Sequence, residues 1–311
     1  MSQKRLRAYF YLLVASIIWG VAGPVVKYTL FSLPPLIFLT YRFAISTVLA
    51  IPLLFIRRPK LPSSAKLIWF IILISFLTST VRLGLLFFGF EKTTSLSGNL
   101  LSALSPLAVV FAGALFLHER VTRLEKIGIA IAFIGTVISV VEPVLSAEHQ
   151  VLTTTIQGNV LVLTSLIFDV IATILIKIAL RKTIDPLSLT LIMFIVGFAT
   201  IVPVTLYLTS PTNVIATIVH APLSAHLGVW YMAFLSGLLA YTLDFKGLKT
   251  IEVGEASVFT YLSPIWGVPI SLLLLNETVS GPFILGAIII FVGVVIAEYK
   301  RTKRKPALRR R

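Results

Sequence analysis

Long apolar stretches follow one another along this chain, with only short polar connections between them. The connections at 57–66, 143–155 and 210–225 are the longest, and none is large enough to form a separate domain. A helix needs about 20 apolar residues to cross a bilayer. Ten stretches approach that length, at 9–30, 35–56, 67–90, 94–117, 124–142, 156–179, 186–209, 226–248, 254–276 and 280–298. The pattern predicts an all-α integral membrane protein with ten transmembrane helices.

The second half of the chain nearly repeats the first. The segment LSPLAVVFAGALFLHERV around Pro106 aligns without a gap with LSPIWGVPISLLLLNETV around Pro264, at a separation of 158 positions (264 minus 106). Each copy holds five predicted spans, and an odd number returns the second copy to the membrane upside down. Inverted repeats of this kind are typical of secondary transporters. We expect repeats at 1–143 and 156–298, an external linker at 144–155 and a basic tail at 299–311.

Composition and charge agree with a membrane protein. The chain is 57% hydrophobic and 13% charged, which argues against a soluble domain. Its net charge is +15, but the basic residues fall on one side of the ten-span map, while the opposite loops contain little more than Lys92. This positive-inside pattern places both termini in the cytoplasm. It also argues against nucleic-acid binding and leaves contact with anionic lipid as a role for the basic tail.

The residue types for metal or thiol chemistry are missing or scattered. The chain has no cysteine, and its four histidines lie at loops or helix ends without ligand spacing. We therefore expect neither a metal nor a cofactor. The first apolar run is too long for a cleavable signal peptide and no small-residue cleavage site follows it, so we expect it to remain as the first span.

Three charged residues are expected inside the membrane, where each costs about 2.5–3.5 kcal/mol to insert. Arg82 falls in the outer half of the third span, Asp169 near the middle of the sixth and Asp244 in the inner half of the eighth. They are not repeat equivalents, since Arg82 aligns with Ala240 and Asp244 with Leu86. A charge that only supported the common scaffold would occur in both copies. We interpret the three as cargo or coupling residues, with a structural ion pair as the alternative.

Uncharged polar residues form stripes on several of the same spans. They could supply shape and hydrogen bonds to a cargo at the membrane midplane, or they could be ordinary contacts between helices. The candidates are Trp19, Asn99, Ser102, Tyr241, Thr260 and Ser263. Arg42, Lys27 and Lys177 are interpreted as structural, the two lysines reaching toward the helix ends by snorkelling.

Two prolines and two glutamates are candidates for conformational change. Pro106 and Pro264 lie in the fourth and ninth spans, where proline breaks the helix and creates either a hinge or a static kink. Glu119 and Glu277 end these spans on opposite membrane faces. A carboxylate at a helix C-terminus opposes the helix dipole. We therefore expect each to have a partner in the next helix or loop and a structural or gating role.

Short motifs recur in a fixed order along the whole chain. They are WG at 19–20, YRF at 41–43, the serine-to-proline stretch at 95–106, and the HE and NE endings at Glu119 and Glu277. In these the chain resembles the EamA-type, ten-helix branch of the drug/metabolite transporter superfamily. The resemblance implies a cavity lined by spans one, three, four, six, eight and nine, and movement of small metabolites across the cytoplasmic membrane.

Together these features predict a secondary transporter that works by alternating access. Arg82 would meet an anionic group, and Asp169 or Asp244 a cationic amine or a coupling proton. An amino acid or related zwitterion fits this pair of charges, and the resemblance alone suggests export. One alternative is efflux of organic cations or drugs. Others are a passive channel and a membrane enzyme acting on lipid-linked substrates, although the chain lacks a clustered carboxylate pair, a metal-ligand cluster or a nucleophile motif.

Overall fold

The computed structural model describes most of the chain. Within the described part all regular elements are helical. The described residues are 3–57, 64–102, 104–117, 123–124, 126–128, 130–131, 133–135, 138, 149–181, 184–277 and 281–298.

Helices follow the predicted spans closely in both halves. The first half contains α1 (Gln3–Leu30), α2 (Pro35–Arg57), α3 (Ala65–Phe76), η1 (Leu77–Arg82), α4 (Leu83–Lys92), α5 (Ser95–Ser102) and α6 (Ser105–Leu117). The second half contains α8 (His149–Arg181), α9 (Pro186–Leu208), α10 (Pro211–Val219), α11 (Leu223–Trp230), η2 (Tyr231–Ala240), α12 (Tyr241–Thr250), α13 (Val253–Ser257), η3 (Val258–Leu262), α14 (Ser263–Leu275) and α15 (Gly281–Glu298).

Seven of the described helical segments are long and apolar enough to cross a membrane, and three shorter apolar helices lie at 126–135, 265–275 and 284–293. The expected all-α multi-pass membrane fold is therefore confirmed. The count of ten spans, the repeat boundaries and the cytoplasmic termini stay predictions. Two connections differ from expectation: α8 begins at His149, within the expected linker, and the connection after α9 contains the short helix α10.

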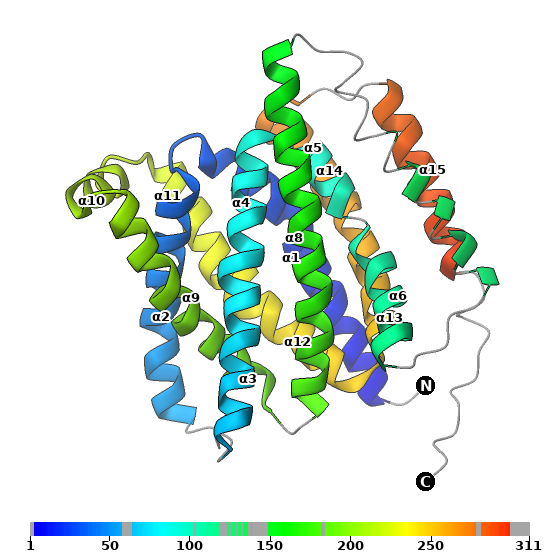
Figure 1. Cartoon of the computed structure of the whole chain (residues 1–311), viewed down its shortest axis with the longest axis horizontal. Coiled ribbons are helices and arrows are strands. Elements are labelled where there is room, and N and C mark those ends of the chain that lie inside the picture. The colour runs from blue at the N-terminus through cyan, green and yellow to red at the C-terminus, as the bar shows by residue number, and fades with distance from the viewer. Residues whose placement is uncertain are drawn as a thin grey trace.

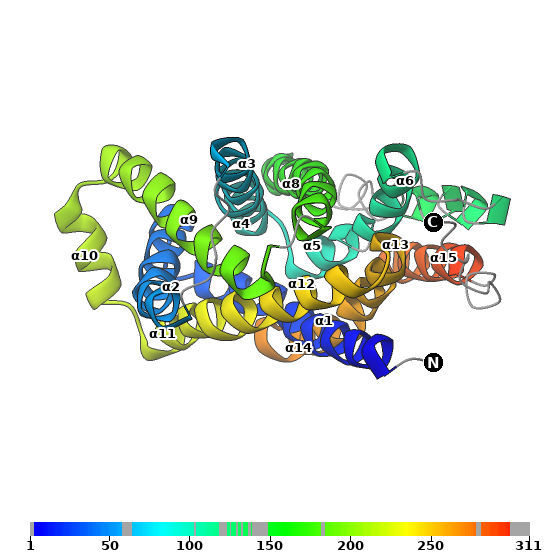
Figure 2. The same cartoon turned by 90° about the horizontal axis from the view of Figure 1, so that it is seen from below.

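The helices form two rows with the candidate site between them. Figure 2 shows α9, α3, α8 and α6 in one row and α2, α12, α1 and α14 in the other. The two rows are joined near both ends. At one end α2 packs against α9, and toward the other end α5 packs against α14. Each row packs tightly within itself, as where α4 lies against α8 and α1 lies against both α12 and α14.

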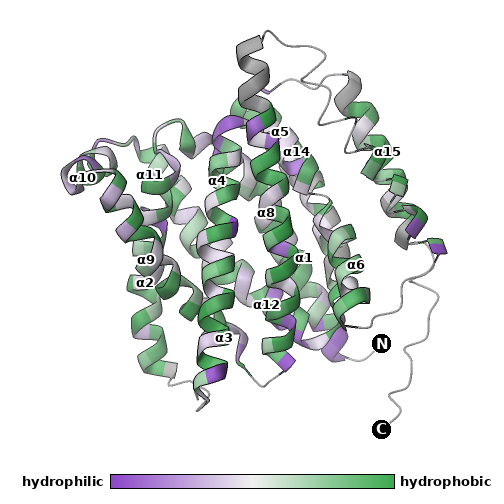
Figure 3. Ribbon diagram, viewed as in Figure 1, coloured by the Kyte–Doolittle hydropathy of each residue, from purple (hydrophilic) through white to green (hydrophobic). Residues whose placement is uncertain are grey.

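Corresponding helices of the two halves run in opposite directions. In Figure 1, α1 rises from the end of the molecule where the N-terminus lies, and α8 descends toward that end. The α3–α4 segment likewise rises, whereas α11–α12 descends. The ends of α1, α3, α8 and α12 at this edge carry the basic residues Lys4, Lys66, Arg181 and Lys249. Figure 3 shows hydrophilic positions gathered at the helix ends and apolar residues along most of their lengths.

Four helices are interrupted at equivalent places. The π-helical segments η1 and η2 end at Arg82 and Ala240, which are 158 positions apart (240 minus 82). The fourth span restarts as α6 at Ser105, and the ninth restarts as α14 at Ser263 after a 3-10 turn. In both restarts the second residue is proline, which fits the first turn of a helix because that turn needs no amide donor. These breaks in regular helix surround the cavity described below, as π-turns at functional sites often do.

Equivalent residues of the two halves also make equivalent contacts. A Cβ added to Gly89 of α4 would lie 2.7 Å from the Val162 side chain of α8, and one added to Gly247 of α12 would lie 2.6 Å from Leu12 of α1. Gly89 and Gly247 are 158 positions apart (247 minus 89), and Leu12 and Val162 are 150 apart (162 minus 12). Both helix pairs therefore depend on glycine for their close approach.

The two intramembrane lysines fix helix ends in the same way. Lys27 Nζ donates to the carbonyl of Phe90 (2.8 Å), and Lys177 Nζ donates to the carbonyls of Leu248 and Ile251. Both lysines thus satisfy carbonyls at helix C-termini that lack an intrahelical donor. Their predicted structural role agrees with these contacts. Snorkelling is wrong for Lys177, because its side chain is only 5% exposed and is held by backbone carbonyls inside the protein.

Candidate functional site

A cavity of about 200 Å³ lies between the two rows of helices. It is smaller than the roughly 300–1,000 Å³ typical of sites for drug-sized ligands, which favours a small metabolite. All nine residues predicted to bind cargo line it: Trp19, Arg82, Asn99, Ser102, Asp169, Tyr241, Asp244, Thr260 and Ser263. Tertiary structure thus gathers into one place residues that are up to 244 positions apart (263 minus 19).

An ion pair crosses the cavity between η1 and α8. Arg82 Nε lies 2.5 Å from Asp169 Oδ1, and the two side chains are 21% and 22% exposed. Ser105 Oγ donates to Asp169 Oδ2 at 2.7 Å, and Arg82 Nη1 donates to the Tyr241 hydroxyl at 3.0 Å. Both charges are therefore already satisfied, as the ion-pair alternative required. A cargo carboxylate would reach Arg82 only by competing with Asp169.

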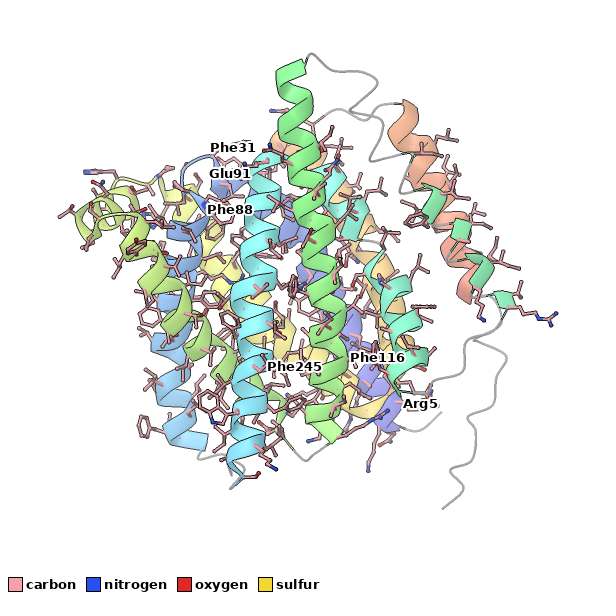
Figure 4. All side chains as sticks on the ribbon, in the orientation of Figure 1. Arg5, Phe31, Phe88, Glu91, Phe116 and Phe245 are labelled. Atoms are coloured by element: carbon pink, nitrogen blue, oxygen red, sulfur yellow. The ribbon has the colours of Figure 1, made fainter. Side chains whose placement is uncertain are left out.

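Two aromatic side chains form a wall beside this pair. The rings of Trp19 and Tyr241 meet edge to face, with centroids 5.1 Å apart. Trp19 Nε1 donates to the carbonyl of Ser236 at 3.1 Å, and Tyr241 also packs against Phe245 at 5.8 Å. Because the indole and phenol groups have partners, these rings are held in fixed positions. Figure 4 places Phe245 in the half of the molecule nearer Arg5 and away from Phe31 and Glu91.

Asn99 lies at the tightest crossing of the cavity wall. A Cβ on Gly23 of α1 would be 2.3 Å from Asn99 Oδ1, and one on Gly267 of α14 would be 2.9 Å from Asn99 Nδ2. Gly20 meets α14 still more directly, since its added Cβ would lie 2.5 Å from the carbonyl oxygen of Ser263. The Nδ2 group of Asn99 is buried without a hydrogen-bond partner in the described part of the chain. Its hydrogen-bonding capacity is therefore unused among the described residues.

The hydroxyl groups of the remaining predicted residues make few or weak hydrogen bonds within the protein. Ser102 Oγ donates to the carbonyl of Gly98 at 2.8 Å, a bond within its own helix. Ser263 Oγ is 3.5 Å from the carbonyl oxygen of Ser16, at the outer limit of a hydrogen bond. Thr260 lines the cavity, and its hydroxyl makes no hydrogen bond among the described residues. These groups can rotate toward a ligand at little cost.

Asp244 differs from Asp169 in having no cationic neighbour in contact. It lies on α12, three residues after Tyr241, and faces the cavity with partial exposure. No basic side chain in the described ranges lies within 4.0 Å of its carboxylate, and no described hydrogen bond reaches it. The cavity therefore carries an acidic group that is free to meet a cation.

Arg42 is a lining residue that sequence reasoning missed. It lies on α2, expected to be peripheral, yet it is 1% exposed and borders the cavity. Its Nε and Nη1 atoms have no hydrogen-bond partner among the described residues. Its guanidinium lies 5.7 Å from the ring of Phe43 and 5.9 Å from that of Phe87. Cation–π contacts are worth about 0.5–2 kcal/mol each, which offsets only part of the cost of a buried charge. The available signal was its position in the middle of an apolar span.

The polar side chains of the third span point in two directions. Thr78 and Arg82 line the cavity, but Ser79 Oγ donates to the carbonyl of Met193 on α9 at 3.0 Å. The π-helical geometry of η1 explains this difference, because the wider turn changes the angular spacing that a regular helix would impose.

The candidate hinge and gate residues lie at helix ends. Pro106 lines the cavity at the start of α6, and Pro264 stands at the start of α14. Glu277 accepts hydrogen bonds from the backbone amides of Ser95 (2.6 Å) and Leu96 (2.8 Å) at the first turn of α5. It is thus a capping partner for a helix of the other repeat, where a negative charge is favourable. Glu119 lies outside the described residues.

Comparison with known proteins finds relatives over nearly the whole chain. The sequence pattern of the EamA-like transporter family matches residues 6–141 and again residues 156–299. A protein of Salmonella typhimurium (strain LT2) named "Probable amino-acid metabolite efflux pump" is 25% identical over 308 residues, covering 96% of this chain and 97% of that protein. The "Uncharacterized transporter YyaM" of Bacillus subtilis (strain 168) is 24% identical over 305 residues, covering 95% and 94%.

Solved structures are also similar in three dimensions, among them one crystal structure. It is 17% identical to this chain, has a TM-score of 0.65 and covers 93% of this chain and 97% of that one. At this level of identity the likeness concerns the fold alone.

Proposed function

This chain belongs to the EamA-like transporter family, and from that premise we propose that it exports amino acids or related zwitterions by alternating access. Membership makes it a multi-pass membrane transporter of small molecules and not an enzyme. The cargo, the direction and the mechanism are the proposal. The observation that carries it is the small cavity between the two rows of helices, which is lined by charged groups of both signs.

The charges of the cavity suit a zwitterion. Asp244 is the acidic group without a described cationic partner, so it would receive the amine of the cargo. Arg82 would receive an anionic group only in a state in which its pair with Asp169 opens. The uncharged donors of Asn99 and Ser102 would complete the site. A buried charge on a ligand is tolerated only where the protein offers an opposite charge, and this cavity offers both.

Alternating access is supported by the paired breaks in the helices. Discontinuous helices at equivalent places in two inverted halves are typical of carriers that rock around a central site. Here the breaks before Pro106 and Pro264 border the cavity from both halves. Export is supported by the Salmonella relative, whose name describes an amino-acid metabolite efflux pump.

A counterflow assay tests this proposal. Proteoliposomes loaded with unlabelled amino acid should accumulate the same labelled amino acid, with L-leucine, L-serine and L-phenylalanine as the first probes. Asp244→Asn should lower the rate at least tenfold by removing the partner of the amine. Asp185→Asn is the matched control, because Asp185 caps α9 outside the cavity and asparagine also caps helices well. Equal rates in the wild type and Asp244→Asn would contradict the proposed site.

Efflux of organic cations is a second candidate, favoured by one observation. Asp244 lies beside the aromatic wall of Trp19, Tyr241 and Phe245, and an acidic group with aromatic faces suits a hydrophobic cation. The two functions separate in competition. Decarboxylated amines should displace a labelled amino acid poorly if the cargo is a zwitterion and well if it is a cation. Proton coupling, a further role for Asp244, predicts that an imposed pH gradient drives uptake in the wild type and not in Asp244→Asn.

A further inference from the structure

Two arginines and two aspartates line the cavity, and their contacts among the described residues leave one charge of each sign unpaired. Arg82 and Asp169 neutralise each other, with Tyr241 and Ser105 completing their hydrogen bonds. Asp244 and Arg42 remain, on α12 and α2. We propose that Arg42 binds the carboxylate of the cargo, opposite the amine bound by Asp244. This inference rests on the proposed transport of zwitterions for its cargo, but the anion site itself can be tested without it.

Burial and missing partners single out Arg42. Its side chain is 1% exposed, and both Nε and Nη1 are shielded from solvent without a hydrogen-bond partner in the described part of the molecule. Buried guanidinium groups are almost always paired with an anion or an acceptor. A carboxylate can accept from two donors of one guanidinium fork at once. Nε and Nη1 lie on different edges of the guanidinium and each forms a fork with Nη2, so either edge of Arg42 is the chemical complement of a carboxylate.

The surroundings hold the guanidinium in position. The rings of Phe43 and Phe87 lie within 6 Å of it. Phe43 is itself fixed, since a Cβ on Gly197 of α9 would come within 2.7 Å of its ring. Aromatic faces attract a guanidinium but cannot accept its hydrogen bonds in the way an oxygen does. They stabilise the cation and leave its donors free for a ligand in the cavity.

The alternative reading is that Arg42 is a structural residue of α2. Ser46 is a natural comparison, because it lies one turn further along α2, is fully buried, and its Oγ also lacks a described partner. It does not border the cavity. If missing partners on α2 reflected only loose packing, substitutions at Arg42 and Ser46 would affect ligand binding alike. If Arg42 binds the ligand, a substitution at Arg42 should weaken ligand binding and one at Ser46 should not.

The first experiment uses acetate as the smallest carboxylate and measures the thermal unfolding midpoint of the purified full chain in detergent. Acetate should raise the midpoint of the wild type, whereas acetamide and chloride at the same concentration should not. The acetate-dependent shift should disappear in Arg42→Gln, persist in Ser46→Ala and persist in part in Arg42→Lys, which keeps the charge but not the fork. The apparent affinity for acetate should fall about tenfold or more in Arg42→Gln.

The second experiment uses a matched set of ligands in competition with labelled L-leucine: 4-methylpentanoate, which lacks the amine, and 3-methylbutylamine, which lacks the carboxylate. Arg42→Gln should weaken leucine and 4-methylpentanoate and spare the amine. Asp244→Asn should weaken leucine and 3-methylbutylamine and spare the acid. Equal losses for acid and amine in Arg42→Gln would overturn the assignment.

The two experiments separate the two proposals. A wild-type protein that acetate does not stabilise, or one whose acetate shift survives Arg42→Gln, would overturn the anion site whatever the cargo is. Acetate stabilisation that depends on Arg42, together with no binding or counterflow of any tested amino acid, would overturn the proposed cargo and leave the anion site in place. If Arg42→Gln does not fold, the wild-type comparison of acetate with acetamide and the Arg42→Lys variant still decide the question.

Discussion

Two helix crossings occupy equivalent places in the two halves of the molecule, yet they pack differently. In one, α1 crosses α14 through Gly20 and Gly267, and Gly23 of α1 meets Asn99 of α5 beside this crossing. Added Cβ atoms at the three glycines would fall 2.3–2.7 Å from the nearest atoms. In the other, α8 crosses α6, and the equivalent positions hold Val170, Thr173 and Val109. The α1 and α8 positions are 150 apart and the α14 and α6 positions 158 apart, as elsewhere in the fold.

The difference shows how a repeated scaffold acquires a one-sided site. Glycines let the backbones of α1 and α14 meet directly, since the added Cβ of Gly20 would lie 2.5 Å from the carbonyl oxygen of Ser263 and that of Gly267 would lie 2.7 Å from the carbonyl oxygen of Gly20. Valine and threonine keep α8 and α6 further from contact, and Thr173 and Val109 border the cavity there. The ion pair of Asp169 lies at this second crossing, bound by Ser105 of α6. Equivalent helix crossings therefore form a close glycine contact in one half of the molecule and a polar wall of the cavity in the other half.

The largest expected effect comes from opening the glycine crossing. Gly20→Val would drive a side chain into the backbone of α14, because even its Cβ lies 2.5 Å from the carbonyl oxygen of Ser263. Extra methylenes forced into a packed core cost about 1–3 kcal/mol. Here three carbon atoms meet a backbone, so we expect a loss above that range, with a lower unfolding midpoint in detergent and loss of transport. Gly84→Val is the control, since a Cβ there meets nothing within 4 Å. Equal behaviour of the two variants would mean that the crossing is not closely packed.

A smaller effect on stability, with a full effect on function, is expected at the polar crossing. Asp169→Asn would leave the Arg82 guanidinium without its counter-charge. Breaking a fully buried pair costs about 3–5 kcal/mol, and we expect less here because a fifth of each side chain is exposed. The variant should fold, as judged by size-exclusion chromatography and its unfolding midpoint, and should lose counterflow. A variant that transports normally would show that the ion pair is dispensable.

The smallest effects compare the two equivalent serines. Ser105→Ala removes a 2.7 Å hydrogen bond to a carboxylate, and such bonds contribute about 1.5–3 kcal/mol. Ser263→Ala removes only a 3.5 Å contact with the carbonyl of Ser16, so we expect a change within about 0.5 kcal/mol. Unfolding midpoints of the two variants should therefore separate, with Ser105→Ala the less stable. The reverse order would contradict the assignment of the polar crossing to α6 and α8.

Much of the candidate site followed from the sequence. The intramembrane charges Arg82, Asp169 and Asp244 stood out because lipid makes an unexplained charge expensive, and their lack of repeat equivalents marked them as special to one half. The cost of burial that makes such residues rare also makes them easy to find. Arg42 carried the same signal, but its expected place on a peripheral helix argued for a structural role. Only its position beside the cavity, with donors unpaired, assigns it to the site.

Other features depended on tertiary contacts from the start. The sequence could not decide whether Arg82 and Asp169 form an ion pair with each other or bind a ligand. Both interactions are electrostatically favourable, and which one forms depends on the distance between the charged groups. The π-helical turn η1 sent Ser79 to α9 and Arg82 to the cavity, although a regular helix would have placed them on one face. The expectation that Glu277 has its partner in the next helix or loop is wrong, because it accepts hydrogen bonds from the amides of Ser95 and Leu96 on α5, far away in the sequence.

The sequence by itself determined that this protein is a helical membrane protein with two related halves, because lipid allows only apolar helices of a certain length and because a repeat is written in the order of residues. It also identified the charged residues whose insertion into the membrane is unfavourable, so that a structural or functional role is expected for each. Only the tertiary structure decided which charges neutralise each other and which stay open, because electrostatic and hydrogen-bond energies depend on distances of a few ångströms between helices. The unpaired Arg42 and Asp244 are the outcome of that choice.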